Sequence, residues 1–192
     1  LSLGRGLHIL LGPNGSGKTT FLKLVVGLLR PTTGYVRVLG MDPREDFAEL
    51  SKRLSFAFEG LPLPWWLPGR EFAELVFAIR RPSRLAEELV ASLGVRAYWG
   101  KLPPAYSSGM KKRLQLALAL GIEADLYVLD EPFTLLDDAS VSKALSAMGS
   151  LVSGGKTLLV ATHFLPEGFA DMASSVVKFQ GGRVVEVQRL RG

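Results

Sequence analysis

An octet near the start of the chain combines closely spaced glycines with a lysine and a threonine. It reads Gly-Pro-Asn-Gly-Ser-Gly-Lys-Thr over Gly12–Thr19, which matches the phosphate-binding pattern G-x-x-x-x-G-K-[ST]. Glycines let backbone N–H groups approach phosphate oxygens, and a helix that begins here adds its dipole. Lys18 would reach the β- and γ-phosphates of ATP, and the Thr19 hydroxyl would bind Mg²⁺. The predicted nucleotide-binding residues of this loop are Gly12, Pro13, Asn14, Gly15, Ser16, Gly17, Lys18, Thr19 and Thr20.

Two adjacent carboxylates follow the apolar stretch Leu126–Leu129, which reads as a short buried strand. Ligands of parallel sheets bind at the carboxyl ends of the strands, where Asp130 and Glu131 would lie. Asp130 would then hold Mg²⁺, and Glu131 would polarise the water that attacks the nucleotide. A solvated turn after a core strand is the alternative. The phosphate-binding loop upstream favours the catalytic interpretation.

A histidine ends a second apolar stretch, Leu158–Thr162. A single histidine is more often structural or simply exposed. At the end of a strand that neighbours the Asp130 strand, however, His163 could hydrogen-bond the γ-phosphate and sense its hydrolysis. We therefore predict that Glu131 and His163 are the catalytic residues.

Strand and helix patterns alternate along the chain and would position these groups. We predict an α/β fold of the P-loop NTPase type, with a mostly parallel sheet flanked by helices on both faces. The stretch 70–122 contains helical patterns without strands, so a single domain 1–192 would consist of a core, 1–69 and 123–192, and an inserted helical subdomain. The predicted strands are 7–11, 35–39, 54–58, 126–129, 157–161 and a hairpin over 176–187, and the predicted helices are 18–29, 45–53, 70–80, 83–93, 108–123 and 139–152.

Composition excludes several classes of protein. The 192 residues are 47% hydrophobic, which suits one domain, and no apolar stretch approaches the ~20 residues of a membrane span. The absence of cysteine excludes disulfides, thiol catalysis and cysteine-bound zinc. The net charge of +5 includes one tight basic run, Lys111–Arg113, without interleaved aromatic residues. We therefore expect no nucleic-acid partner. Nothing at the start of the chain indicates secretion.

The stretch Tyr106–Leu114 resembles the signature motif, L-S-G-G-Q, of ATP-binding-cassette (ABC) transporter ATPase subunits. Its opening Tyr-Ser and its Gly-Met are similar to the branch that exports drugs, ions, polysaccharides and antibiotics. Ser107 and Gly109 would place a hydroxyl and a bare backbone N–H at a helix N-terminus, a second site for anions. In this family two subunits form a head-to-tail dimer, in which each ATP contacts the phosphate loop of one and the signature of the other. The resemblance thus implies a homodimer or heterodimer of ATPase subunits.

Further motifs follow in the order of this family. Pro31–Gly40 resembles the family's P-T-S-G-x-V-x-V-x-G, and Gly69–Glu71 resembles the start of its helical subdomain. Thr134–Asp137 resembles its D-loop, which implies that Asp137 communicates between the two nucleotides. Arg183 and its hairpin resemble the closing strand. Glu59 lies where the family carries its Q-loop glutamine, so its carboxylate would bind Mg²⁺ together with Thr19 and Asp130.

The sequence also departs from the family pattern. Glu59 replaces glutamine, and Ser108 and Met110 replace two signature residues, while the backbone donor of the signature is retained. The family has a longer segment before the first strand, which supplies an aromatic ring that stacks on adenine. The sequence begins at Leu1, so either it lacks the start of the protein or this subunit binds adenine in another way.

The leading interpretation is an ATP-hydrolysing subunit of an ABC exporter. It would be cytoplasmic and peripheral on the inner face of the cell membrane, where it would drive a membrane permease. The loop Leu61–Pro68, with two adjacent tryptophans, is the candidate surface for that permease, unless both rings fold back onto the helical subdomain. Alternatives are a nucleotide-gated binding module with little hydrolysis, or a relative in DNA repair or translation. The single asparagine, Asn14, leaves no guanine-reading N-K-x-D, so a GTPase is not expected.

Overall fold

The sheet at the centre of the molecule has six strands in the order β2-β3-β4-β1-β5-β6. The computed structural model describes residues 1–190. The five strands from β2 to β5 run parallel, and β6 pairs with β5 in the antiparallel sense. The strands are β1 (Leu7–Leu11), β2 (Leu54–Ala57), β3 (Leu126–Asp130), β4 (Thr157–Thr162), β5 (Ser175–Gln180) and β6 (Arg183–Arg189).

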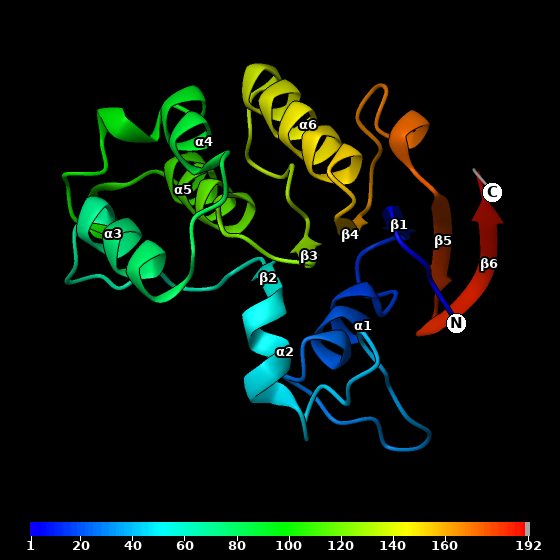
Figure 1. Ribbon diagram of the computed structural model, residues 1–192. Coiled ribbons are helices and arrows are strands. Elements are labelled where there is room, and N and C mark those ends of the chain that lie inside the picture. Colours follow the sequence, from blue (N-terminus) through cyan, green and yellow to red (C-terminus); the bar gives the residue numbers. More distant parts are fainter. Residues whose placement is uncertain (191–192) are drawn as a thin grey trace.

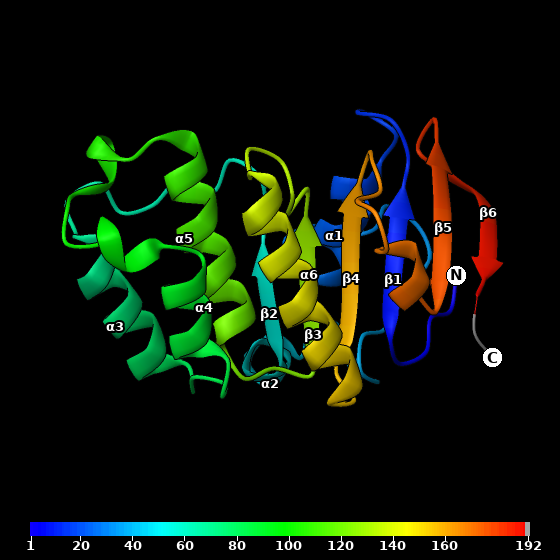
Figure 2. The same ribbon diagram turned by 90° about the horizontal axis from the view of Figure 1, so that it is seen from above.

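Helices cover both faces of this sheet, as predicted (Figures 1 and 2). Helices α1 and α2 lie on one face and α6 on the other, while α3, α4 and α5 form a group beside the β2 end (Figure 1). The helices are α1 (Lys18–Val25), α2 (Phe47–Arg53), α3 (Gly69–Ile79), α4 (Ala86–Ser92), α5 (Ser108–Gly121) and α6 (Asp138–Ser153), with short 3₁₀ turns at Val95–Ala97, Pro103–Ala105 and Ala170–Met172.

Each central strand is buried on both faces, because its successive side chains enter different cores. Ile9 packs in the core under α5 and α6, while its neighbour Leu10 packs under α1 and α2. On β3, Leu129 packs in the same core as Ile9, and its neighbour Val128 packs in the same core as Leu10. Such strands read in the sequence as continuous apolar runs, which is why β1, β3 and β4 lie within a residue of their predicted bounds.

Two predicted elements differ most from the structure. The predicted strand 35–39 has no neighbouring strand among residues 1–190 and forms only an isolated bridge, between Val38 and Met41. The first helix ends at Val25 rather than Leu29, because Gly27 adopts a left-handed φ of 79°. A Cβ on Gly27 would lie 2.2 Å from the Pro43 carbonyl oxygen, so this position requires glycine.

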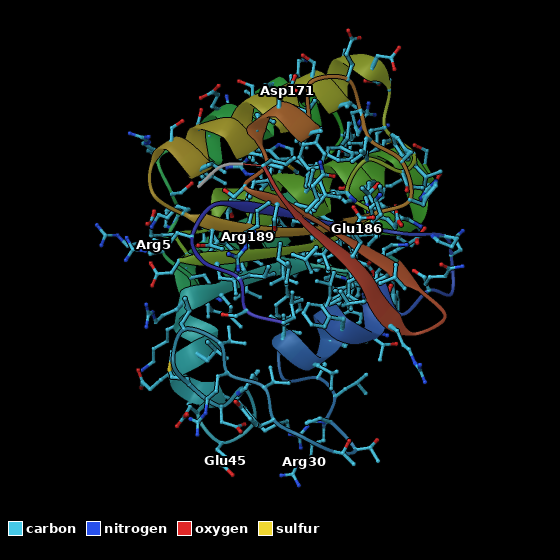
Figure 3. The ribbon with its side chains drawn as sticks, turned by 90° about the vertical axis from the view of Figure 1, so that its right-hand side faces the viewer. Arg5, Arg30, Glu45, Asp171, Glu186 and Arg189 are labelled. Carbon is cyan, nitrogen blue, oxygen red and sulfur yellow. The ribbon has the colours of Figure 1, made fainter. Side chains whose placement is uncertain are left out.

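The outer edge of the sheet is solvent-facing. All of β6 is exposed, and Glu186 and Arg189 lie along it in Figure 3. Charged side chains also project at the bottom of that view, where Arg30 and Glu45 lie beyond α1 and α2 (Figure 3). Within residues 1–190, no helix is both long and apolar enough to cross a membrane.

Tyr127 offers a test of the core. Its side chain is fully buried on β3, and its hydroxyl donates to the Ile122 carbonyl (2.8 Å) and accepts from the Ala124 N–H (3.3 Å). Tyr127→Phe leaves both backbone groups unpaired, so we expect the free energy of unfolding to fall by about 1–3 kcal/mol. Denaturant unfolding measures it. Tyr35→Phe, at a residue that is 84% exposed, is the control, and an equal effect of both would contradict the assignment.

Candidate nucleotide-binding site

The loop between β1 and α1 packs tightly against the turn between β5 and β6. A Cβ on Gly12 would lie 2.4 Å from the Phe179 carbonyl oxygen, and one on Gly17 would lie 3.1 Å from the Gly182 Cα. Gly17 also has a φ of 101°, which favours glycine. The Gly182 N–H donates to the Ser16 carbonyl at 3.0 Å. The glycines at both positions are therefore required by close backbone contacts.

Lys18 begins helix α1 and is buried, with 5% of its surface exposed. Its Nζ donates to the carbonyl oxygens of Gly12 (2.6 Å) and Pro13 (3.2 Å), so the side chain folds back over the loop. The same Nζ lies 3.6 Å from Glu131 Oε1. A buried ammonium needs such partners, and phosphate oxygens placed over the loop would be within its reach.

Thr19 and Asp130 come together from α1 and β3. The Thr19 hydroxyl donates to Asp130 Oδ2 at 2.8 Å. Asp130 is 2% exposed, and burial raises the pKa of its carboxyl, an effect that the hydrogen bond from Thr19 opposes. Its other oxygen, Oδ1, is buried without a hydrogen-bond partner among the described residues. A hydroxyl beside a carboxylate with a spare oxygen is a donor set that fits Mg²⁺.

Glu131 is held from three directions. Its N–H donates to the Ala161 carbonyl on β4 (2.8 Å), and its φ of 47° turns the chain sharply after β3. Its Oε2 lies 2.9 Å from His163 Nδ1, and its Oε1 faces Lys18. β4 lies between β3 and β1, so the ends of three adjacent strands bring these groups together. The predicted residues Lys18, Thr19, Asp130, Glu131 and His163 thus form one cluster.

Ser107, Gly109 and Asp137 form a second group around the start of α5. The Ser107 hydroxyl caps this helix by accepting from the Met110 N–H at 3.2 Å. A Cβ on Gly109 would lie 2.9 Å from the Leu135 carbonyl oxygen. No hydrogen bond or ion pair between described residues links this group to the phosphate loop.

Asp137 caps the next helix, α6, by accepting from the Ser140 N–H at 2.7 Å. Its Oδ2 also lies 3.2 Å from Arg113 Nη1. The hydrogen bonds from Ser140 lower the pKa of this exposed carboxyl. Asp137 therefore remains charged and ties the start of α6 to α5.

Glu59 lies beyond the end of β2 and is exposed. It lines a cavity of about 560 Å³ together with Trp65, Ser108, Lys112 and Leu135. No hydrogen bond or ion pair among the described residues joins its carboxylate to Thr19 or Asp130. Its predicted part in binding Mg²⁺ stays a prediction.

One residue of this region was not predicted. Lys112 belongs to the basic run Lys111–Arg113, yet it is 7% exposed and its Nζ donates to the Asp130 carbonyl at 3.5 Å. Helical spacing could have indicated this burial, because Lys112 lies one turn before the buried Leu116 and two turns before Ala119.

Comparisons with known proteins agree with this geometry. The family model described as "ABC transporter" matches residues 3–134. The daunorubicin resistance ATP-binding protein DrrA3 of Streptomyces coeruleorubidus is 34% identical in an alignment of 191 positions, which covers 96% of this chain and 60% of that protein. A putative ABC transporter ATP-binding protein of Pyrococcus horikoshii is 30% identical, over 95% of this chain and 73% of its own length.

Solved structures show the same similarity. The ATP-binding subunit of an ABC transporter superposes with a TM-score of 0.85 at 26% identity, over 96% of this chain and 79% of that one. A bacterial ABC transporter cassette, solved as a dimer, superposes with a TM-score of 0.83 at 26% identity, over 100% of this chain and 89% of that one. A dimeric post-hydrolysis state of that cassette is bound to ADP and Pi.

The chain spans 60% and 54% of the length of two daunorubicin-resistance relatives, the second from Streptomyces peucetius. Over that span the fold, the phosphate loop and the strand-end carboxylates occur together with a match to the family model. The chain belongs to the family of ABC transporter ATP-binding proteins.

Proposed function

We propose that this chain binds and hydrolyses ATP with Mg²⁺ as the ATPase subunit of an ABC transporter of the export type. One observation carries the proposal. Lys18, Thr19, Asp130, Glu131 and His163 meet at the carboxyl ends of three adjacent parallel strands, in contacts of 2.8–3.6 Å. The match to daunorubicin-resistance proteins supports the export direction.

Each residue has a defined task in this reaction. The Lys18 ammonium exchanges its Gly12 and Pro13 carbonyls for the β- and γ-phosphate oxygens. Thr19 and Asp130 would hold Mg²⁺, which neutralises phosphate charge when bound. Glu131 accepts a proton from the attacking water, and His163 fixes its carboxylate in position and contacts the γ-phosphate.

The second phosphate-binding group would act in a dimer. Ser107 and Gly109 lie at the start of α5, a helix of 14 residues, and not at the phosphate loop of their own chain. In a head-to-tail pair, this helix end of one copy would face the ATP of the other, with Asp137 beside it. The dimeric structures of a similar cassette support this arrangement.

A membrane permease would bind at the loop Leu61–Pro68. Trp65 is 68% exposed and Trp66 64% exposed, and their rings contact each other edge to face, with centroids 5.5 Å apart. An exposed aromatic pair favours an interface. This docking would place the chain on the inner face of the membrane. We also propose that the chain is one domain, with a core of residues 1–69 and 123–192 and a helical subdomain of residues 70–122.

Lys18→Ala tests the nucleotide site. Loss of the ammonium removes charge-assisted hydrogen bonds to the phosphates, so we expect MgATP affinity to fall at least about 100-fold. Titration calorimetry measures it. Lys23→Ala, in the last turn of the same helix, is the matched control. Retained affinity in Lys18→Ala would refute the phosphate-loop assignment.

Glu131→Gln tests hydrolysis. Without the general base we expect turnover to fall at least about 100-fold while ATP binding persists. Because ATP would bridge two subunits, the variant should elute as a dimer in size-exclusion chromatography with ATP. Glu45→Gln, at an exposed site far from the cluster, should behave as wild type (Figure 3). Turnover of Glu131→Gln at the wild-type rate would exclude this residue as the base. If the wild-type protein binds ATP without hydrolysing it, the chain is a nucleotide-gated module instead.

The double variant Trp65→Ala with Trp66→Ala tests docking. Both rings are exposed, so we expect little change in ATP hydrolysis by the isolated protein and loss of co-purification with the permease from source membranes. Tyr35→Ala removes another exposed aromatic ring and should leave co-purification intact. A double variant that still binds the permease would contradict the assignment of this surface.

A further inference from the structure

Lys112 is a buried cation that has no task in the mechanism above. Its Nζ donates to the backbone carbonyl of Asp130, and both groups are buried. Burial lowers the pKa of Lys112, while the carboxylates of Glu59, Asp130 and Glu131 favour its charged form. A charged group in such a position is stabilised only by partners of opposite sign. The acidic groups around the strand ends supply them.

The register of the sheet explains why Glu59 acts on the same lysine as the catalytic carboxylates. Ala57 of β2 pairs with Leu129 of β3. Glu59 and Glu131 each follow two residues later, so both leave the sheet at the same edge. Carboxylates at one edge of a sheet repel one another unless cations offset their charge. Besides Lys18, which lies 3.6 Å from Glu131, Lys112 is a cation that the fold places at this edge.

Helix α5 contacts both segments through neighbouring side chains. Lys112 reaches the end of β3 at the Asp130 carbonyl, and Gln115, one turn later, donates through Nε2 to the Leu61 carbonyl at 2.6 Å. Lys112, Gln115 and Glu59 line the same cavity. The helix therefore holds the loop after β2 and the carboxyl end of β3 in one arrangement.

We propose that Lys112 is a positioning residue, which ties α5 to the carboxyl end of β3 and offsets the charge of Glu59 beside Asp130 and Glu131. As far as catalysis is concerned, the inference rests on the proposed ATPase function. The charge pairing itself does not rest on that function, because it is present in the protein before any nucleotide binds. Lys112 touches no reacting group, so its effect should fall on the geometry of Asp130 and Glu131.

A double-mutant cycle tests the pairing: wild type, Lys112→Met, Glu59→Gln and the combination. Without nucleotide, the change in the midpoint of thermal unfolding of the double variant should differ from the sum of the two single changes by about 2 °C or more. Glu59→Gln should lower the midpoint less, or raise it, when Lys112 has been replaced. Lys111→Met, at the exposed neighbour, should show no such coupling to Glu59→Gln. Additive midpoints would overturn the proposal. If Lys112→Met does not fold, Lys112→Gln, which also removes the charge, replaces it in the same cycle.

Steady-state kinetics of the same proteins test positioning. Lys112→Met should lower kcat at least about tenfold and change KM for ATP less than about threefold, because it disturbs the strand end rather than the phosphate contacts. A kcat equal to that of Lys111→Met would overturn the positioning role. Failure of the Lys18→Ala prediction would refute the nucleotide site and leave the thermal coupling unaffected, so the two hypotheses fail separately.

Discussion

The Lys18 ammonium lies inside the molecule, and its charge must be compensated there. The loop supplies two carbonyls, and β3 supplies the Glu131 carboxylate at 3.6 Å. β4 lies between β3 and β1, and its Ala161 carbonyl accepts from the Glu131 N–H and so fixes the turn after Asp130. The burial of the Lys18 charge therefore depends both on the strand order and on the turn at Glu131.

Much of this arrangement could be predicted from the sequence. Buried parallel strands produce continuous apolar runs, so β1, β3 and β4 have clear ends, and the residues after those ends are the site. The glycine spacing of the phosphate loop adds a pattern with a known physical reason. The pairing of β3 with β4, expected from the positions of Asp130 and His163, is present in the sheet.

The rest depended on contacts between distant residues. Tyr35–Leu39 alternates like a strand, but a strand requires a partner, and residues 1–190 provide only the Val38–Met41 bridge. Helix α1 ends early at Gly27, which adopts a left-handed φ of 79°, and no local pattern indicates that Pro43 contacts this glycine. The burial of Lys112 was not predicted, because lysines are seldom buried and its compensating carboxylates lie elsewhere in the chain.

The charges of the site bear on the need for a second subunit. Two ammonium groups, Lys18 and Lys112, interact with the three carboxylates of Glu59, Asp130 and Glu131, so these five side chains together carry an excess of negative charge. ATP brings more negative charge than one Mg²⁺ neutralises. Backbone N–H groups at the start of α1 offset part of it, and a second helix end would offset more. Ser107 caps such an end on α5, away from the phosphate loop of its own chain. Under the proposed function, a head-to-tail dimer is the arrangement that brings the missing positive potential to each nucleotide.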